Sequence, residues 1–432
     1  MLEPRAMISR VAIVSTGDEL TSGKIADTNA QWLADRCFTL GIEVVAVLAV
    51  GDDRERIRWA WENALAQAEV VLSTGGLGPT SDDLTTETIA ALLGEKLRFE
   101  QDVADRIRAM FRAMSREMPE NNLKQAYFPE SAVIVPNPLG TAPGYRAACV
   151  RAGTERHLVV LPGVPREMHR MFDDTVGPWL AAMTDVTTAV ASRTFQTFGV
   201  SESALDERVG RVVRLDEARI SYRASFPKIA VRLMVRDVPD RAEARVEELA
   251  ARVRVELGTA IFGEGEVTME EVVGRALRDR GATLAVAESC SGGLVGHRLT
   301  DMPGSSAYLL ADYVTYSNAA KMDVLGVSAA TLERHGAVSE ETAREMAAGA
   351  RRRSGATVAV ATTGVAGPDG GTPDKPVGTV CFALSAADQE VSRRHQLWGT
   401  RDWVKLLTSQ LALDWLRRWA LGLSVVESGF RR

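Results

Sequence analysis

Residues 11–51, VAIVSTGDELTSGKIADTNAQWLADRCFTLGIEVVAVLAVG, contain two apolar runs on either side of a helical pattern. The runs VAIVSTG (11–17) and IEVVAVLAVG (42–51) are rich in β-branched residues, and Gly41 ends the helical stretch between them. A second helical stretch leads to a third apolar run, EVVLSTGG (69–76). Near-continuous apolar strands separated by helices predict an α/β fold whose parallel sheet is covered on both faces.

The bulk composition is that of a soluble globular protein of two or three domains. The chain has 432 residues, 46% of them hydrophobic and 25% charged. A formal net charge of −6 argues against direct nucleic-acid binding, which usually needs a basic face. No apolar run has the length of a membrane span, and the N-terminal residues do not resemble a signal peptide. We therefore expect a cytoplasmic protein without a membrane partner.

The cysteines and histidines are scattered along the chain. The sequence contains no CxxC pair among its four cysteines, which are Cys37, Cys149, Cys290 and Cys381. This spacing argues against a disulfide scaffold and against a zinc site. Widely spaced cysteines of this kind are typical of a reducing compartment.

Three domains are expected from the order of the patterns. Residues 7–178 form the first α/β domain, and residues 186–263 read as a small α+β unit of strand, helix, two strands and helix. Residues 268–425 again alternate strands and helices and form a second α/β domain, closed by a long helix.

A glycine-rich turn followed by two aspartates forms the first candidate site, in STGGLGPTSDDLTTETIAALLG (73–94). The expected substrate-binding glycines, which allow close backbone approach, are Gly75, Gly76 and Gly78. Loop N–H groups could bind phosphate, and Asp82 and Asp83 point to a divalent metal ion that bridges carboxylate and phosphate. The alternative is that these two aspartates only cap the following helix.

Further carboxylates follow the first two strands. Glu19 comes after the first strand and Asp52 after the second. Ligands of open α/β sheets bind at the carboxyl edge of the strands. The four carboxylates Glu19, Asp52, Asp82 and Asp83 therefore favour metal-assisted phosphoanhydride chemistry over helix capping alone.

The N-terminal motifs resemble the competence/damage-inducible protein A (CinA) family. The matching stretches are TGDEL (16–20), STGGLGPTSDDLT (73–85), NNLKQAYFPE (121–130), NPLGTAPGY (137–145) and LPGVPREM (161–168). The resemblance implies a molybdopterin-binding-like fold and hydrolysis of ADP-ribose to AMP and ribose 5-phosphate. It also implies a divalent metal (Mg²⁺, Mn²⁺ or Co²⁺), with K⁺ as a further candidate. Asp83 and Asp52 match acidic positions of the family.

The C-terminal third resembles the nicotinamide-nucleotide amidohydrolase domain of the same family. The matching stretches are AESCSGG (287–293), GSSAYLLADYVTYSNAAK (304–321), HGAVSEETA (335–343), TTGVAGPDGGTPDKPVGTV (362–380) and GTRDWVK (399–405). The resemblance implies deamidation of nicotinamide mononucleotide to nicotinic acid mononucleotide and ammonia, without a cofactor. The family's Ser–Lys pair falls on Ser289 and Lys321. Its active-site tyrosine, polar residue and substrate-binding arginine fall on Tyr316, Thr363 and Arg401.

The residues support this chemistry beside the resemblance. Amide hydrolysis needs a nucleophile and a base, and a lysine whose pKa is lowered by burial can replace histidine. Lys321 is the only lysine between Lys228 and Lys375, and like Ser289 it follows a predicted strand. Cys290 remains a rival nucleophile, although neighbouring strand residues face opposite sides.

Purely structural roles remain possible at this point for several of these residues. Lys321 could be a solvated helix residue, Tyr316 could belong to the strand core, and Arg401 could simply begin the last helix. Ser291 and the expected substrate-binding glycines Gly292 and Gly293 open a helix, and their N–H groups could serve the nucleotide phosphate or the oxyanion.

Other functions stay open at this point. The N-terminal fold also fits a molybdopterin-binding or molybdenum-cofactor protein, and the family name fits a non-catalytic partner in competence or DNA repair. The middle unit resembles the family's KH-type domain but has no GXXG loop, so it reads as a spacer or a dimer element. The resemblance further implies a homodimer.

Overall fold

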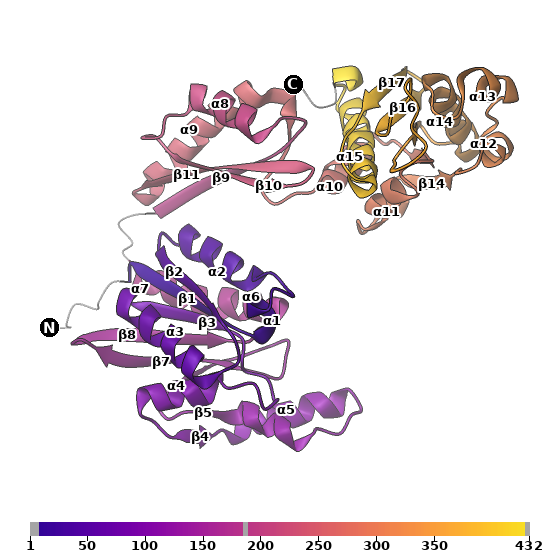
Figure 1. The fold of residues 1–432 in the computed structure, drawn as a ribbon. Coiled ribbons are helices and arrows are strands. Elements are labelled where there is room, and N and C mark those ends of the chain that lie inside the picture. The colour runs from indigo at the N-terminus through magenta and orange to yellow at the C-terminus, as the bar shows by residue number, and fades with distance from the viewer. Residues whose placement is uncertain (1–7, 185–188, 428–432) are drawn as a thin grey trace. The chain divides into compact units, whose positions relative to one another are not determined.

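The structure is a computed structural model that describes residues 8–184 and 189–427 (Figure 1). The chain divides into two compact units, one formed mainly by residues up to Ala191 and the other by residues from Ser192 onward. The expected domain boundaries at residues 7 and 186 lie outside the described residues. Within the described ranges, no helix is both long enough and apolar enough to cross a bilayer.

The first unit is built on a six-stranded sheet in the order β2-β1-β3-β8-β7-β6. Its strands are β1 (Arg10–Thr16), β2 (Glu43–Val50), β3 (Val70–Thr74), β6 (Val133–Val135), β7 (Gly144–Arg151) and β8 (Thr154–Leu161). The strands β2, β1, β3 and β8 are parallel, as expected, whereas β7 and β6 pair antiparallel. The expected parallel sheet is therefore confirmed for β2, β1, β3 and β8. The antiparallel edge of β7 and β6 was not predicted, because apolar patterning does not report strand direction.

Helices cover both faces of this sheet. Along β1, Ala12 and Val14 belong to one apolar cluster, and Val11 and Ile13 belong to another. The first cluster includes residues of α3 (Arg54–Gln67), and the second includes residues of α2 (Thr28–Thr39). The alternation places one buried core on each side of the sheet, as the near-continuous apolar strands predict.

Shorter elements complete the first unit. They are α1 (Asp18–Thr21), α4 (Thr85–Leu93), β4 (Leu97–Phe99), α5 (Gln101–Ala113), the 3₁₀ helix Glu120–Ala126, β5 (Tyr127–Pro129), α6 (Pro165–Met171), a π-helical turn Phe172–Val176 and α7 (Gly177–Met183).

The middle region confirms the predicted order of strand, helix, two strands and helix. Its elements are β9 (Ala189–Phe198), α8 (Glu202–Val212), β10 (Arg219–Ser225), β11 (Lys228–Asp237), α9 (Pro239–Leu257), the 3₁₀ turn Gly258–Ala260 and β12 (Ile261–Glu264). The sheet order is β10-β11-β9-β12, so β12 adds an edge strand that the patterning missed.

The C-terminal region has a five-stranded sheet in the order β14-β13-β15-β16-β17. Its strands are β13 (Leu284–Glu288), β14 (Leu309–Val314), β15 (Val358–Gly364), β16 (Thr379–Ala386) and β17 (Glu390–Gln396). The first three in the sheet order are parallel, and β16 and β17 pair antiparallel. The helices are α10 (Met269–Asp279), α11 (Leu294–Thr300), α12 (Asn318–Leu325), α13 (Ala329–His335), α14 (Glu340–Ser354) and α15 (Arg401–Ala420), with short 3₁₀ turns at Ser305–Ala307 and Val425–Glu427.

This second sheet is also buried on both faces. Leu284 and Val286 of β13 pack in the cluster that contains residues of α10 and α15, whereas Ala285 and Ala287 pack with residues of α14. The α/β architecture predicted for the C-terminal third is confirmed.

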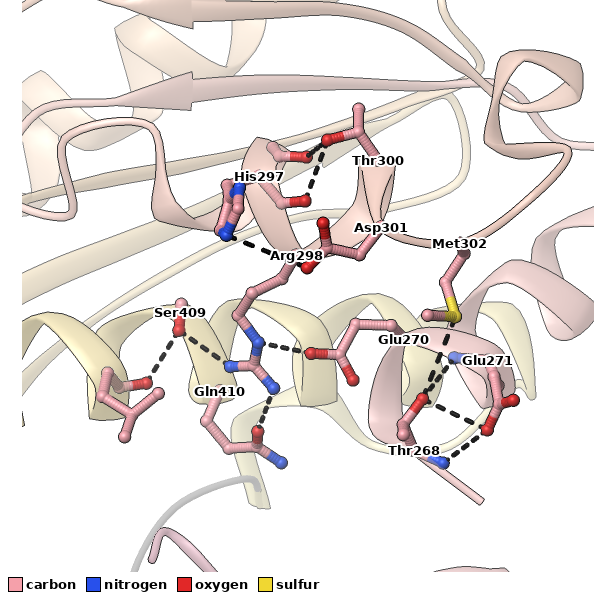
Figure 2. Close-up of polar contacts among 12 residues, drawn as sticks. Thr268, Glu270, Glu271, His297, Arg298, Thr300, Asp301, Met302, Ser409 and Gln410 are labelled. Atoms are coloured by element: carbon pink, nitrogen blue, oxygen red, sulfur yellow. Dashed lines mark hydrogen bonds and ion pairs between the residues drawn. The ribbon is translucent and has the colours of Figure 1, made fainter. Parts of the chain in front are cut away.

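A largely shielded arginine, Arg298, fixes α15 beside α11 and α10 (Figure 2). Arg298 of α11 forms an ion pair with Glu270 of α10, and the pair is mostly shielded from solvent. The same guanidinium donates to Ser409 Oγ at 2.8 Å and to Gln410 Oε1 at 2.6 Å, both on α15. Because α11 follows the Ser289 turn, these bonds set the position of α15 relative to that turn.

Candidate active site

Ser289 and Lys321 meet at the carboxyl edge of the C-terminal sheet. Ser289 directly follows β13, and Lys321 lies on α12, which follows the adjacent parallel strand β14. The Lys321 Nζ atom lies 3.0 Å from Ser289 Oγ, and both residues are buried. The topology thus brings together two side chains that are 32 residues apart in sequence.

The environment of Lys321 is that of a base rather than of a surface lysine. Its side chain is only 1% exposed, so the alternative of a solvated helix residue is wrong. Nζ donates to the carbonyl of Thr315 at 2.7 Å and lies 3.4 Å from the carbonyl of Tyr316. Burial lowers the pKa of the Lys321 amine, because the charged form loses its hydration.

Cys290 packs in the apolar core, whereas Ser289 contacts Lys321. Its side chain belongs to the apolar cluster of the domain and is 6% exposed. Burial raises the pKa of the thiol to about 12, so it stays protonated at neutral pH. A buried, protonated thiol is a poor nucleophile, which weakens the cysteine alternative.

Several backbone N–H groups of the turn after Ser289 donate hydrogen bonds to residues of the turn itself or of the strand before it. The Gly293 and Gly296 N–H groups donate to the Glu288 carboxylate at 2.9 and 2.8 Å, and the Gly292 N–H donates to the Ser289 carbonyl at 3.2 Å. The expectation that the Gly292 and Gly293 N–H groups stay open to an anion is therefore wrong. Glu288 caps the start of α11 instead.

Asp312 lies beside Glu288 beneath this turn. A Cβ atom on Gly296 would lie 2.1 Å from Asp312 Oδ2, so only glycine leaves room for the carboxyl group. Burial, and then the nearby Glu288 carboxylate, raise the pKa of Asp312 to about 7. Asp312 is therefore the proton-bearing member of this carboxyl pair below that pH.

Asp312 should make the stability of the C-terminal domain pH-dependent. An unfolded aspartate ionises near pH 4, so between about pH 4 and 7 the folded state binds the extra proton. Stability then falls as pH rises through this window and levels off above it. We expect wild type to lose about 1–3 kcal/mol more than Asp312→Asn between pH 5 and 8, measured by urea unfolding. Parallel pH profiles for the two proteins would contradict this assignment.

Two of the other expected site residues, Tyr316 and Arg401, form the outer side of the same site, whereas Thr363 is buried. Tyr316 is 64% exposed, so it is not a core residue, and its hydroxyl accepts a hydrogen bond from Arg401 at 3.1 Å. Arg401 also donates to the Gly367 carbonyl at 2.6 Å. The hydroxyl of the buried Thr363 donates to the Ala337 carbonyl at 2.7 Å and thereby fixes the segment before α14.

In the N-terminal unit, the glycine-rich turn lines a cavity of about 890 Å³. Gly76, Gly78 and Asp83 are among its lining residues, together with Lys124 and Tyr127. The glycines are required by the turn itself. A Cβ atom would lie 2.1 Å from Thr85 Oγ1 at Gly76, and 2.4 Å from Asp83 Oδ2 at Gly78.

Gly75 and Asp83 also have roles within the loop. A Cβ atom at Gly75 would lie 2.2 Å from the Thr16 carbonyl oxygen at the end of β1. Asp83 Oδ2 accepts hydrogen bonds from the backbone N–H of Thr80, at 2.8 Å, and from its hydroxyl. The aspartate thus holds the loop in shape at the wall of the cavity.

A cluster of carboxylates surrounds Asp52. Asp52 and Asp18 each accept a hydrogen bond from the other's backbone N–H, at 2.9 and 3.1 Å. The pKa of Asp52 is raised. Burial is the largest cause, followed by the nearby carboxylates of Asp18, Glu19 and Asp82. Glu19 and Asp82 are therefore close enough to affect Asp52, whereas Asp83 lines the cavity.

This acidic cluster suits a hard cation that is completed by substrate. Among residues 8–184 and 189–427, no three acidic, histidine or cysteine side chains are arranged to hold a metal ion alone. Mg²⁺ is usually held by one or two carboxylates together with substrate phosphates and water. The mutual repulsion at Asp52 is what such a cation would relieve, so the donor set fits.

Sequence reasoning missed two polar residues of these sites, Lys124 and Lys405, and placed a third, Asn29, at the carboxyl edge of the first sheet, where it lies. Lys124 lines the N-terminal cavity and donates to the Thr80 carbonyl at 3.0 Å. Asn29 is buried and joins the ends of two strands, because it donates to Thr74 Oγ1 at 3.0 Å and to the Gly163 carbonyl at 2.7 Å. Lys405 lies by Gly292, and its helical spacing of four from Arg401 was the available signal.

Three family models match successive parts of the chain. The probable molybdopterin binding domain matches residues 12–182, the damage-inducible protein CinA KH domain matches 192–263, and the CinA C-terminal domain matches 266–420. The molybdopterin-binding-like, KH-like and CinA C-terminal assignments of the fold are thereby confirmed.

Full-length relatives are similar over almost the whole chain. A CinA-like protein of Geotalea uraniireducens (strain Rf4) is 40% identical over 425 residues, 97% of this chain and 99% of the relative. A Shewanella oneidensis protein named nicotinamide-nucleotide amidohydrolase PncC is 41% identical over 418 residues, 96% of this chain and 97% of that one. The crystal structure of a competence/damage inducible protein CihA from Agrobacterium tumefaciens is 43% identical, covering 34% of this chain and 93% of that chain, with a TM-score of 0.33.

Proposed function

The chain belongs to the CinA family, and on that premise we propose that its C-terminal domain is a nicotinamide-nucleotide amidohydrolase. It would hydrolyse nicotinamide mononucleotide to nicotinic acid mononucleotide and ammonia. The observation that carries the proposal is the buried contact of 3.0 Å between Lys321 Nζ and Ser289 Oγ. The name of the Shewanella oneidensis relative supports the same activity.

The geometry supports a covalent route. With the amine neutral, its two N–H groups can donate to the Thr315 and Tyr316 carbonyls, and its lone pair faces the Ser289 hydroxyl. Lys321 takes the hydroxyl proton as Ser289 Oγ attacks the amide carbon, and returns a proton to the leaving nitrogen. Ammonia departs and leaves an ester on Ser289. A water molecule, activated by the same amine, then hydrolyses the ester to the acid.

Ammonia release by the wild-type protein tests this activity. We expect nicotinamide mononucleotide to yield ammonia and nicotinic acid mononucleotide in equal amounts, at a rate that EDTA does not change. Lysine-activated serine needs no metal ion, which is the reason for the expected insensitivity. No ammonia above the rate of a heat-denatured control would overturn the proposal.

For the N-terminal domain we propose metal-dependent hydrolysis of ADP-ribose to AMP and ribose 5-phosphate. The cavity of about 890 Å³ and the carboxylates around Asp52 support it. Asp52, Asp82, Asp83 and Glu19 are the residues that would hold the cation, and a bound divalent cation would polarise the phosphoanhydride. Molybdopterin binding is the second candidate, favoured by the family model that matches residues 12–182.

Removal of metal should separate the two activities within one protein. We expect AMP formation from ADP-ribose to be abolished by EDTA and restored by Mn²⁺ or Mg²⁺, while ammonia release is unchanged. Asp52→Asn should lower AMP formation at least about 10-fold. Asp53→Asn is the matched control, because Asp53 caps α3, where asparagine caps equally well. Tight binding of molybdopterin without AMP formation would favour the second candidate.

A further inference from the structure

Two cations on successive turns of α15 face the Ser289 site. Arg401 and Lys405 are four residues apart, so they share one face of the helix. Arg401 reaches Tyr316 and Gly367. Lys405 Nζ lies 3.7 Å from the position that a Cβ atom on Gly292 would occupy. Both cations therefore border the turn that carries Ser289.

Neither cation forms an ion pair with a carboxylate of the described residues. The well-shielded arginines of the same domain, Arg298, Arg417 and Arg418, do form such ion pairs. Lys405 is half-buried, so its ammonium group is less fully hydrated than that of an exposed surface lysine. In a chain of net charge −6, this leaves uncompensated positive charge at one end of the site.

The approach to Lys405 is open because residue 292 is a glycine. Gly292 is exposed and has φ +65°, and any side chain there would project toward the amine. The Gly292 and Gly293 N–H groups already donate within the turn, so these two groups are not open to a phosphate. Arg401 and Lys405 can supply positively charged donors to it.

We propose that Lys405, together with Arg401, binds the phosphate monoester of the substrate and makes the deamidase selective for nucleotides over nucleosides. This inference rests on the proposed amidohydrolase function and adds the residue that selects the substrate class. A phosphate monoester carries between one and two negative charges at neutral pH and forms charge-assisted hydrogen bonds to lysine and arginine. The bond that reacts and the group that is recognised then lie at opposite ends of the ligand.

The test compares nicotinamide mononucleotide with nicotinamide riboside, which lacks the phosphate. Lys405→Met keeps the alkyl stem and removes the charge. We expect the ratio of kcat/KM for the nucleotide to that for the riboside to fall about 10- to 100-fold, through KM rather than kcat. Lys405→Arg should retain most of the ratio. Arg352→Met, which removes a charge from the exposed end of α14, serves as the matched control and should leave the ratio unchanged.

An equal loss on both substrates, or no change with the nucleotide, would overturn the role of Lys405. If the wild type releases no ammonia, the proposed function fails, and calorimetric titration with inorganic phosphate and nicotinamide mononucleotide still decides the inference. Binding to wild type that weakens at least about 10-fold in Lys405→Met supports the phosphate site. Equal binding by the two proteins rejects it.

Discussion

Replacing Ser289 with alanine is expected to lower ammonia release from nicotinamide mononucleotide by at least about 10³-fold, because the covalent route loses its nucleophile. Cys290→Ala should retain activity within a few fold, since the thiol packs in the core. Both rates are measured by coupled detection of ammonia. If Cys290→Ala were inactive and Ser289→Ala active, Cys290 would be the nucleophile and Ser289 would not.

Lys321→Met should produce a loss of similar size, and the double variant should be no worse than either single one. Residues that act as one unit give such non-additive losses. Since the base must be neutral, wild-type kcat/KM should rise with pH and level off above the pKa of Lys321, which burial places below the ordinary lysine value. Simple addition of the two losses would argue against a shared proton transfer.

Replacing Asp414 with alanine is expected to cost the C-terminal domain about 3–5 kcal/mol of unfolding free energy. Asp414 forms ion pairs with Arg417 at 2.7 Å and with Arg418 at 2.8 Å. All three side chains are at most 6% exposed. Loss of the carboxylate leaves two buried guanidinium groups without their counter-ion.

The matched control for Asp414 is an exposed aspartate–histidine contact of the same domain. Asp301 lies 3.8 Å from His297, with both side chains more than half exposed, so Asp301→Ala should change the stability by less than about 1 kcal/mol. Urea unfolding of the two variants gives the comparison. Equal losses would mean that the buried triad contributes no more than a surface pair.

Local sequence patterns determined much of the architecture. Apolar runs between amphipathic stretches indicated the α/β class, and Ser289 and Lys321 could be placed together because each follows a parallel strand. The order of elements in the middle region was equally local. The antiparallel strands β6 and β7 were not predicted, because hydrophobic patterning does not encode strand direction.

The charges within each site depended on contacts between distant residues. From the sequence, Glu288 could either orient Lys321 or cap the following helix, and only the tertiary structure shows that it accepts from the Gly293 N–H group. The position of Lys405 beside Gly292 required α15 to pack on α11 through Arg298. The sequence alone therefore determined the fold class through its periodicity. It proposed the nucleophile and the base mainly through the family resemblance of the motifs that carry Ser289 and Lys321, and strand order placed both at the same edge of the sheet. Only the tertiary structure decided which hydrogen-bonding groups are occupied and which cations remain unpaired, because those depend on packing between elements far apart in the chain.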